Sequence, residues 1–123
     1  MQKKSYHNTT DLEIARIGFT DDEYEIYVVT DDDGKIPHFH YLKNDGLIKF
    51  YSCIKIENAE YFHHDNAQNI LSHEQKINLI AFLNKRCIKN MSNWEVLLDC
   101  WNMNNSEIQV SDSLAMPDYM NLK

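Results

Sequence analysis

The stretch Gly34-Lys35-Ile36-Pro37-His38-Phe39-His40-Tyr41 combines a turn signal, a proline and two histidines that are two residues apart. Proline fixes its own φ and keeps the preceding residue out of the helical region, so the chain enters Pro37 extended. Alternate residues of a strand point to opposite faces, so His38 and His40 share one face. Phe39 and Tyr41 share the other face. The stretch therefore predicts a turn followed by a strand over residues 37–42, anchored in a core by its aromatic residues.

Extended segments lie before this stretch as well. The pattern of residues 12–19 predicts a strand with apolar side chains on both faces, which indicates a bulge or an interior position. Residues 24–29 are rich in β-branched and aromatic residues and predict a second strand. The turn between this strand and the histidine strand is Asp31-Asp32-Asp33-Gly34. It is not a calcium loop, because placing Gly34 sixth would put Val29 first and His40 twelfth.

A fourth strand follows a second hairpin turn, Lys43-Asn44-Asp45-Gly46. Residues 48–56 alternate more clearly than any other segment, with one core face and one wetter face. The wetter face carries Lys49, Tyr51, Cys53 and Lys55. Residues 58–66 form a connector rich in aromatic residues and histidine, which we expect to pack at a specific place.

Two capping boxes predict two helices. Ser72-His73-Glu74-Gln75 begins a helix that extends to about residue 86, and Ser92-Asn93-Trp94-Glu95 begins one that extends to about residue 103. The first is apolar over more than half its circumference, so we expect it to be the central helix against the sheet. The second has Trp94, Leu97, Leu98 and Trp101 at helical spacing.

These elements predict one α+β domain over residues 1–123, an antiparallel sheet of about four strands with two C-terminal helices packed on one face. We expect residues 1–10 to form a mobile lead-in. The tail, residues 106–123, either adds an edge strand or lies over the core.

The charge and the cysteines limit the classes of function. Twelve basic and 19 acidic residues give a formal charge of −7, which opposes attachment to nucleic acid or anionic lipid and fits a basic protein partner. No apolar run is long enough to cross a membrane, and the first residues lack the apolar region of a secretory signal. We therefore expect a cytoplasmic protein. Cys53, Cys87 and Cys100 are far apart, which favours free buried thiols over disulfides or a zinc ribbon.

The order of these elements resembles domain-of-unknown-function family 4160, a prokaryotic family of very small proteins. The residues that carry the resemblance are Pro37-His38-Phe39-His40 before a hairpin strand, and Asn93-Trp94-Glu95 at the start of the last helix. The family typically has Pro-Pro-His-Phe/Val-His and Asn-Trp-Glu at these places. The resemblance covers roughly residues 24–101; Ile36 replaces the first proline, the connector carries an extra Tyr-Phe-His-His, and the tail is longer.

The resemblance implies a component of a mobile-element or toxin–antitoxin-like gene pair. Its marked positions in this chain are Pro37, His38, His40, Asn93, Trp94 and Glu95. No catalytic role comes with them.

The histidines allow a metal hypothesis. On a strand, His38 and His40 project about 7 Å apart from one face, a spacing that suits two ligands of one ion. His63, His64 and Asp65 are the candidates to complete a zinc site. The same groups could supply a general acid and base for phosphodiester chemistry. The alternative is that His38 and His40 occupy a wet face without a chemical role.

We expect a non-enzymatic interaction module without a cofactor, one half of a toxin–antitoxin-like, phage or mobile-element system, with a protein partner that is basic. One alternative is a metal-dependent hydrolase or nuclease that uses a divalent ion such as zinc. The other is an acidic nucleic-acid mimic or inhibitor.

Overall fold

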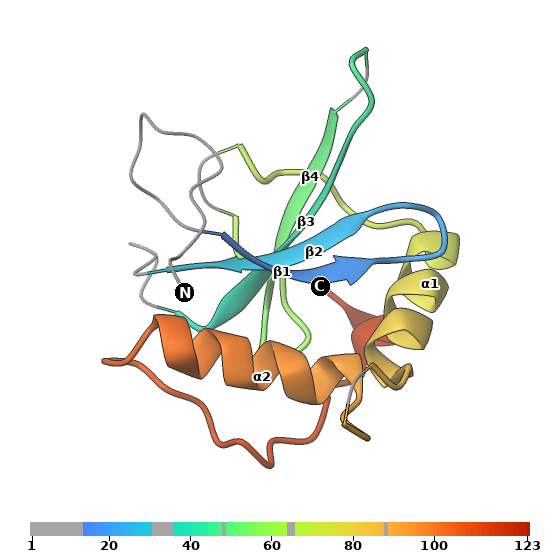
Figure 1. Ribbon diagram of the computed structural model, residues 1–123. Helices are drawn as coiled ribbons and strands as arrows, with labels where there is room; N and C mark the ends of the chain where they lie inside the picture. The colour runs from blue at the N-terminus through green and yellow to red at the C-terminus, as the bar shows by residue number, and fades with distance from the viewer. Residues whose placement is uncertain (1–13, 31–35, 48, 64–65, 88) are drawn as a thin grey trace.

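The computed structural model describes residues 14–30, 36–47, 49–63, 66–87 and 89–123. The expected lead-in, the turn at residues 31–34, His64 and Asp65 lie outside these ranges. Within the described residues, four strands form one antiparallel sheet in the order β1-β2-β3-β4, followed by two helices (Figure 1). This arrangement confirms the predicted α+β fold. The elements are β1 (Ile14–Phe19), β2 (Glu25–Val29), β3 (His38–Asn44), β4 (Lys49–Lys55), α1 (His73–Asn84), α2 (Asn93–Asn104) and a 3₁₀ helix at Tyr119–Asn121.

The pairing of β1 with β2 contains the irregularity that the sequence predicts. Arg16 lies opposite Tyr27 and Gly18 lies opposite Ile26, so the register shifts at Ile17. A bulge of this kind lets apolar residues reach both faces of one strand. Gly18 also permits a close approach to α1, because a Cβ there would lie 3.0 Å from the Phe82 ring.

Both helices begin with the predicted capping boxes. Ser72 Oγ accepts from the Gln75 N–H at 3.1 Å, and the Gln75 side chain accepts from the Ser72 N–H at 2.7 Å. Ser92 and Glu95 repeat the pattern at 3.2 and 2.9 Å. Each box satisfies two amides that the first helical turn cannot. Neither described helix has the length and apolar character that crossing a membrane requires.

The expectation that the first helix is the central one is wrong. α2 lies across β1 and β2, whereas α1 packs beside α2 and the 3₁₀ helix. α1 leaves Ile77 46% exposed and buries Leu79, Phe82 and Leu83. The apolar residues of α1 are spread around the helix. A helix that covers a sheet needs its apolar residues in one contiguous stripe, which α1 lacks. The stripe of α2 buries both tryptophans.

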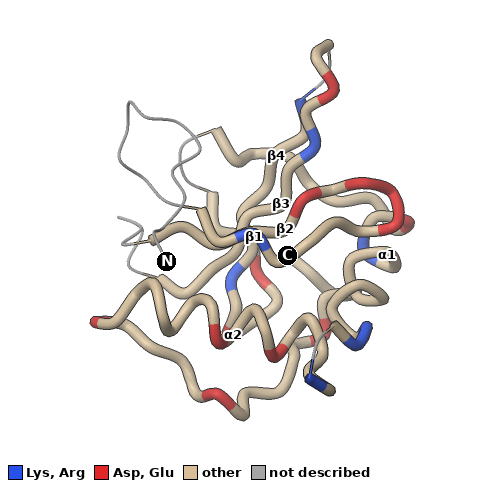
Figure 2. The backbone as a smooth tube through the Cα atoms, in the orientation of Figure 1, with Lys and Arg blue, Asp and Glu red and all other residues tan. Residues whose placement is uncertain are grey.

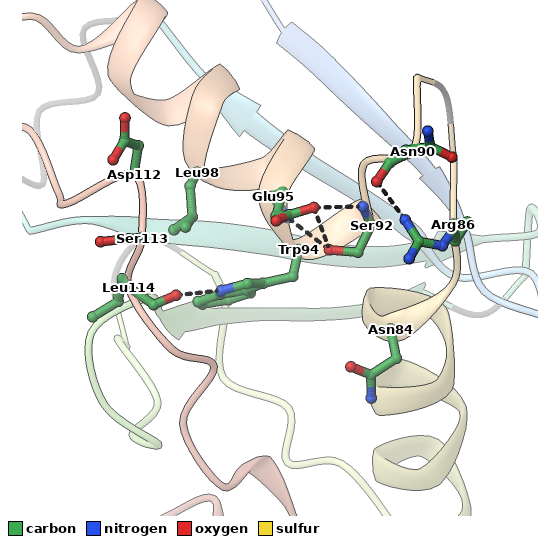
Figure 3. A pocket seen from close by; sticks show the side chains of 10 residues that line it. All are labelled: Asn84, Arg86, Asn90, Ser92, Trp94, Glu95, Leu98, Asp112, Ser113 and Leu114. Carbon is green, nitrogen blue, oxygen red and sulfur yellow. Dashed lines mark hydrogen bonds between the residues drawn. The ribbon is translucent and has the colours of Figure 1, made fainter.

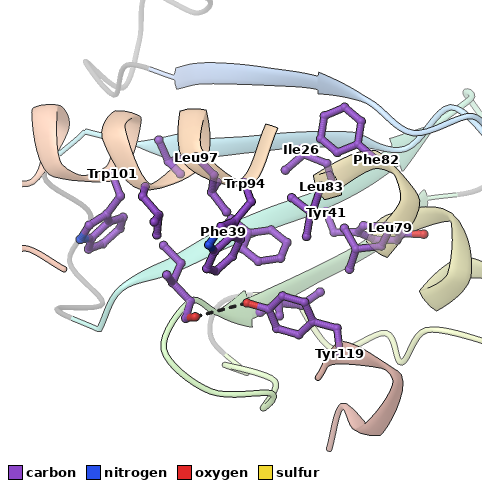
Figure 4. Close-up of a cluster of buried hydrophobic side chains, with 14 of the residues drawn as sticks. Ile26, Phe39, Tyr41, Leu79, Phe82, Leu83, Trp94, Leu97, Trp101 and Tyr119 are labelled. Atoms are coloured by element: carbon purple, nitrogen blue, oxygen red, sulfur yellow. Dashed lines mark hydrogen bonds between the residues drawn. The ribbon is translucent and has the colours of Figure 1, made fainter. Parts of the chain in front are cut away.

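The core lies between the sheet and the helices (Figure 4). Phe39 and Tyr41 of β3 are completely buried in it, as the alternation of that strand predicts. Their neighbours on β2 and β4 are Ile26 and Ile54, which lie opposite them in the register. The helices contribute Leu79, Leu83, Trp94, Leu97 and Trp101, among others.

The tail lies over the core, which decides between the two alternatives. The Trp101 indole donates to the Ile108 carbonyl at 2.7 Å, and the Trp94 indole donates to the Leu114 carbonyl at 2.8 Å. Between them, the Asn102 side chain both donates to and accepts from the Val110 backbone. The tail therefore runs beside α2 and is fixed to it at three places.

Two buried tyrosines give a matched test of the core. Tyr119 donates its hydroxyl proton to the Lys55 carbonyl at 2.8 Å, whereas the fully buried Tyr41 hydroxyl has no hydrogen-bond partner among the described residues. We expect Tyr119→Phe to lower the free energy of unfolding by about 1 kcal/mol. Tyr41→Phe should leave it unchanged or raise it by up to about 2 kcal/mol, because a buried unpaired hydroxyl is costly. Chemical denaturation measures both, and an equal loss in the two variants would contradict this description.

Candidate functional site

The second face of the sheet holds the histidines. His38 is 0% exposed, His40 3% and Cys53 1%, so the expectation of a wet face is wrong at these positions. His40 lies directly opposite Cys53 in the β3–β4 register, and His38 lies opposite Lys55. Directly paired residues of antiparallel strands project from the same face. The hairpin thus brings two imidazoles and a thiol together.

The three side chains form one compact cluster. A ring nitrogen of each histidine and Sγ of Cys53 all lie within 4.8 Å of one another. Within it, His40 Nδ1 lies 3.3 Å from Cys53 Sγ. Imidazole nitrogen and thiolate sulfur are the ligands that zinc and related ions prefer. The cluster therefore has the composition and the compactness of a metal site.

The backbone fixes the orientation of His38. Nδ1 of this ring lies 2.6 Å from the Ile36 carbonyl, which can only accept a hydrogen bond, so Nδ1 carries the proton and donates. The Nε2 atom of the same ring then carries a lone pair. Phe62 packs edge-on against the ring at 4.8 Å, and its own N–H donates to the Cys53 carbonyl at 2.9 Å. The connector thus packs at a specific place, as expected.

Two tyrosines enclose His40. The Tyr27 ring stacks on it at 4.7 Å and the Tyr51 ring at 5.8 Å, both nearly parallel to the imidazole. The Tyr51 hydroxyl lies 2.8 Å from His40 Nδ1. Burial, followed by the neighbouring Tyr27 and Cys53, raises the pKa of the Tyr51 phenol. The phenol therefore stays protonated at neutral pH and acts in hydrogen bonding.

The other predicted ligands do not complete this cluster among the described residues. His63 is exposed, stacks on Tyr61 at 5.6 Å and has Nδ1 3.3 Å from the Ala67 carbonyl. It is not part of the group formed by the two strand histidines and the thiol. His64 and Asp65 lie outside the described residues. Pro37 is buried at the entry to β3.

The Asn-Trp-Glu positions have structural roles. The Asn93 amide donates to the Phe82 carbonyl at 2.9 Å and thereby ties the start of α2 to the end of α1. Trp94 holds the tail through its indole, and Glu95 closes the capping box. The motif is therefore explained by the way these two helices and the tail are joined.

A cavity of about 570 Å³ opens at this junction (Figure 3). It lies between the end of α1, the start of α2 and residues 112–114 of the tail. Among the residues that line it, Arg86 is the basic one, and its guanidinium donates to the Asn90 carbonyl. The amides of Ser92 and Glu95 beside it are occupied by the capping box.

The last third of the chain carries exposed acidic residues and is poor in basic ones. Residues 90–122 contain no lysine or arginine. They contain five exposed acidic residues, which we call the acidic surface: Glu95, Asp99, Glu107, Asp112 and Asp118. Figure 2 shows them along α2 and along the tail beneath it. Three basic residues, Lys85, Arg86 and Lys89, lie between the end of α1 and this segment.

Comparison of the chain with models of protein families, with curated proteins and with solved structures found no match. The resemblance to family 4160 therefore stays a prediction.

The thiols provide a test of the buried cluster. Cys87 is exposed, Cys100 is half-buried and Cys53 is 1% exposed. Burial, and to a smaller extent Asp99, raises the pKa of the Cys100 thiol, which slows its reaction further. In chelator-treated folded protein we expect iodoacetamide to label Cys87 first, Cys100 more slowly and Cys53 only after unfolding. Peptide mapping by mass spectrometry gives the order, and labelling of Cys53 as fast as Cys87 would contradict the buried cluster.

Proposed function

We propose that this protein is a non-enzymatic interaction module that binds a basic protein through the acidic surface of α2 and the tail. The observation that carries the proposal is the segregation of charge, with five exposed acidic residues and no lysine or arginine over residues 90–122. Charge of one sign on a surface attracts partners of the opposite sign and excludes those of the same sign.

The surface is also well ordered for recognition. Asp99 lies on a helix whose opposite side is anchored in the core, and Glu107 and Asp112 lie on a tail that is fixed by the Trp94, Trp101 and Asn102 hydrogen bonds. Binding by an ordered surface avoids the entropy cost of immobilising a flexible one. One partner that such a surface would fit is a basic protein that otherwise binds nucleic acid. In that case this protein would act as the acidic nucleic-acid mimic described above.

The buried cluster favours this proposal over a hydrolase. A catalytic metal or nucleophile needs an open position that substrate can reach. Cys53, His38 and His40 are at most 3% exposed, so a substrate could approach them only if the sheet and the connector opened. The exposed acidic surface needs no such opening to meet a partner.

A charge-neutralising variant tests the proposal. The resemblance implies a gene pair, so the product of the adjacent gene is the partner to purify. We expect Asp99→Asn, Glu107→Gln and Asp112→Asn together to weaken the complex by about tenfold or more, with most of the loss in the association rate. Titration calorimetry and surface binding kinetics measure the affinity and the rate at several salt concentrations.

The matched control removes the same charge elsewhere. Asp21, Glu57 and Glu74 are exposed and lie outside the acidic surface, so Asp21→Asn, Glu57→Gln and Glu74→Gln together should change the affinity much less. The proposal would be abandoned if no complex formed, if added salt did not weaken it, or if both triple variants lost affinity equally.

A further inference from the structure

We propose that His38, His40 and Cys53 form a buried binding site for one divalent transition-metal ion, with Zn²⁺ as the ion that this donor set fits. The site is independent of the acidic surface, since its ligands lie on β3 and β4. Its third ligand is a cysteine on the neighbouring strand, which the sequence did not suggest.

The distances within the cluster are close to those of a metal site. Zinc binds sulfur at about 2.3 Å and histidine nitrogen at about 2.0–2.1 Å, so tetrahedral geometry places the two donor atoms about 3.5 Å apart. The His40 Nδ1 and Cys53 Sγ atoms are 3.3 Å apart. All the donor atoms of the group lie within 4.8 Å of one another, so binding an ion would require them to approach by at most about 1 Å.

The surroundings of His38 resemble those of a metal-bound histidine. A ligating imidazole usually donates its other N–H to a carbonyl or carboxylate, which fixes the tautomer and the ring orientation. The bond from His38 Nδ1 to the Ile36 carbonyl, at 2.6 Å, does this, and it leaves Nε2 as the nitrogen that can bind an ion. The carbonyl is held in place because Pro37 is buried and sets the entry of the chain into β3.

The burial of the three side chains indicates a structural metal site, as opposed to a catalytic one. The imidazoles and the thiol lie together out of contact with water, where one metal ion could bind all three at once. The ring of Phe62 and the β3–β4 hairpin enclose them, so the site is closed to substrate. We therefore assign it a structural role, in which the ion would hold β3 to β4.

The donor set selects the ion. One thiolate and two imidazoles suit Zn²⁺ and exclude Mg²⁺ and Ca²⁺, which require oxygen ligands. Co²⁺ occupies such sites with similar geometry and has visible absorption, so it serves as the probe.

The experiment uses the full chain, stripped with a chelator and titrated with Co²⁺. We expect one ion per chain, with the strong d–d absorption of tetrahedral Co²⁺ and a near-ultraviolet sulfur-to-cobalt charge-transfer band. Added Zn²⁺ should displace the cobalt and raise the melting temperature of the protein. Cys53→Ser should abolish the charge-transfer band. His38→Gln and His40→Gln should each weaken binding by more than the 10–100-fold that loss of an outer partner costs.

Matched controls use residues of the same types outside the cluster. Cys87→Ser, Cys100→Ser and His63→Gln should keep the wild-type spectrum and affinity, because none of these residues belongs to the group. Circular dichroism establishes that each variant is folded. If Cys53→Ser does not fold, protection of Cys53 from alkylation by Zn²⁺ in the wild-type chain gives the same information.

Three results would overturn the proposal. They are no Co²⁺ binding up to millimolar concentration, binding without a sulfur charge-transfer band, and binding that Cys53→Ser leaves unchanged. Each would mean that the histidines, the thiol and Tyr51 form a hydrogen-bonded network that is complete without a metal ion.

Discussion

The alternation of β3 is the constraint on which the rest of the structure depends. Phe39 and Tyr41 lie on one face of the strand, in the core, and His38 and His40 lie on the other face, yet all four are buried. A shift of one residue in register would place the imidazoles in the apolar core and the aromatic rings on the face of the polar cluster. The β3–β4 register therefore determines both the core and the polar cluster, and a change of register would disrupt both.

Local signals in the sequence were sufficient for most of the fold. Both capping boxes, the bulge in β1 and the alternation of the strands depend on residues near one another in the chain, and each is present in the structure. The roles of the helices depend on tertiary packing instead. α1 is the more uniformly apolar helix by sequence, but α2, with its narrower apolar stripe, is the helix that lies across β1 and β2. The course of the tail could not be predicted from the sequence either, because it depends on hydrogen bonds from indole and amide groups of α2. By sequence alone these groups could equally have bonded to water.

The sequence identified two members of the cluster and missed the third. Cys53 lay on the face of β4 that was expected to be wetter, beside strand histidines also expected to be wet. Combining the two patterns would have found it, because a two- or four-residue hairpin turn between these strands places Cys53 on the histidine face. His63 drew attention through composition, but its segment bonds along the outer edge of β4 and turns the ring onto Tyr61. The protein thus has two separate features. One is the buried cluster on β3 and β4, and the other is the exposed acidic surface on α2 and the tail.

The tautomer of His38 tests most directly whether the fold organises this cluster in advance. NMR of the imidazole nitrogens in metal-free protein distinguishes a protonated Nδ1 from a protonated Nε2. We predict that Nδ1 of His38 carries the proton and donates to the Ile36 carbonyl, with Nε2 unprotonated and oriented as a ligand. Finding the proton on Nε2 would contradict the account, because the ring would then offer neither the backbone hydrogen bond nor the metal-binding nitrogen on which the proposed site depends.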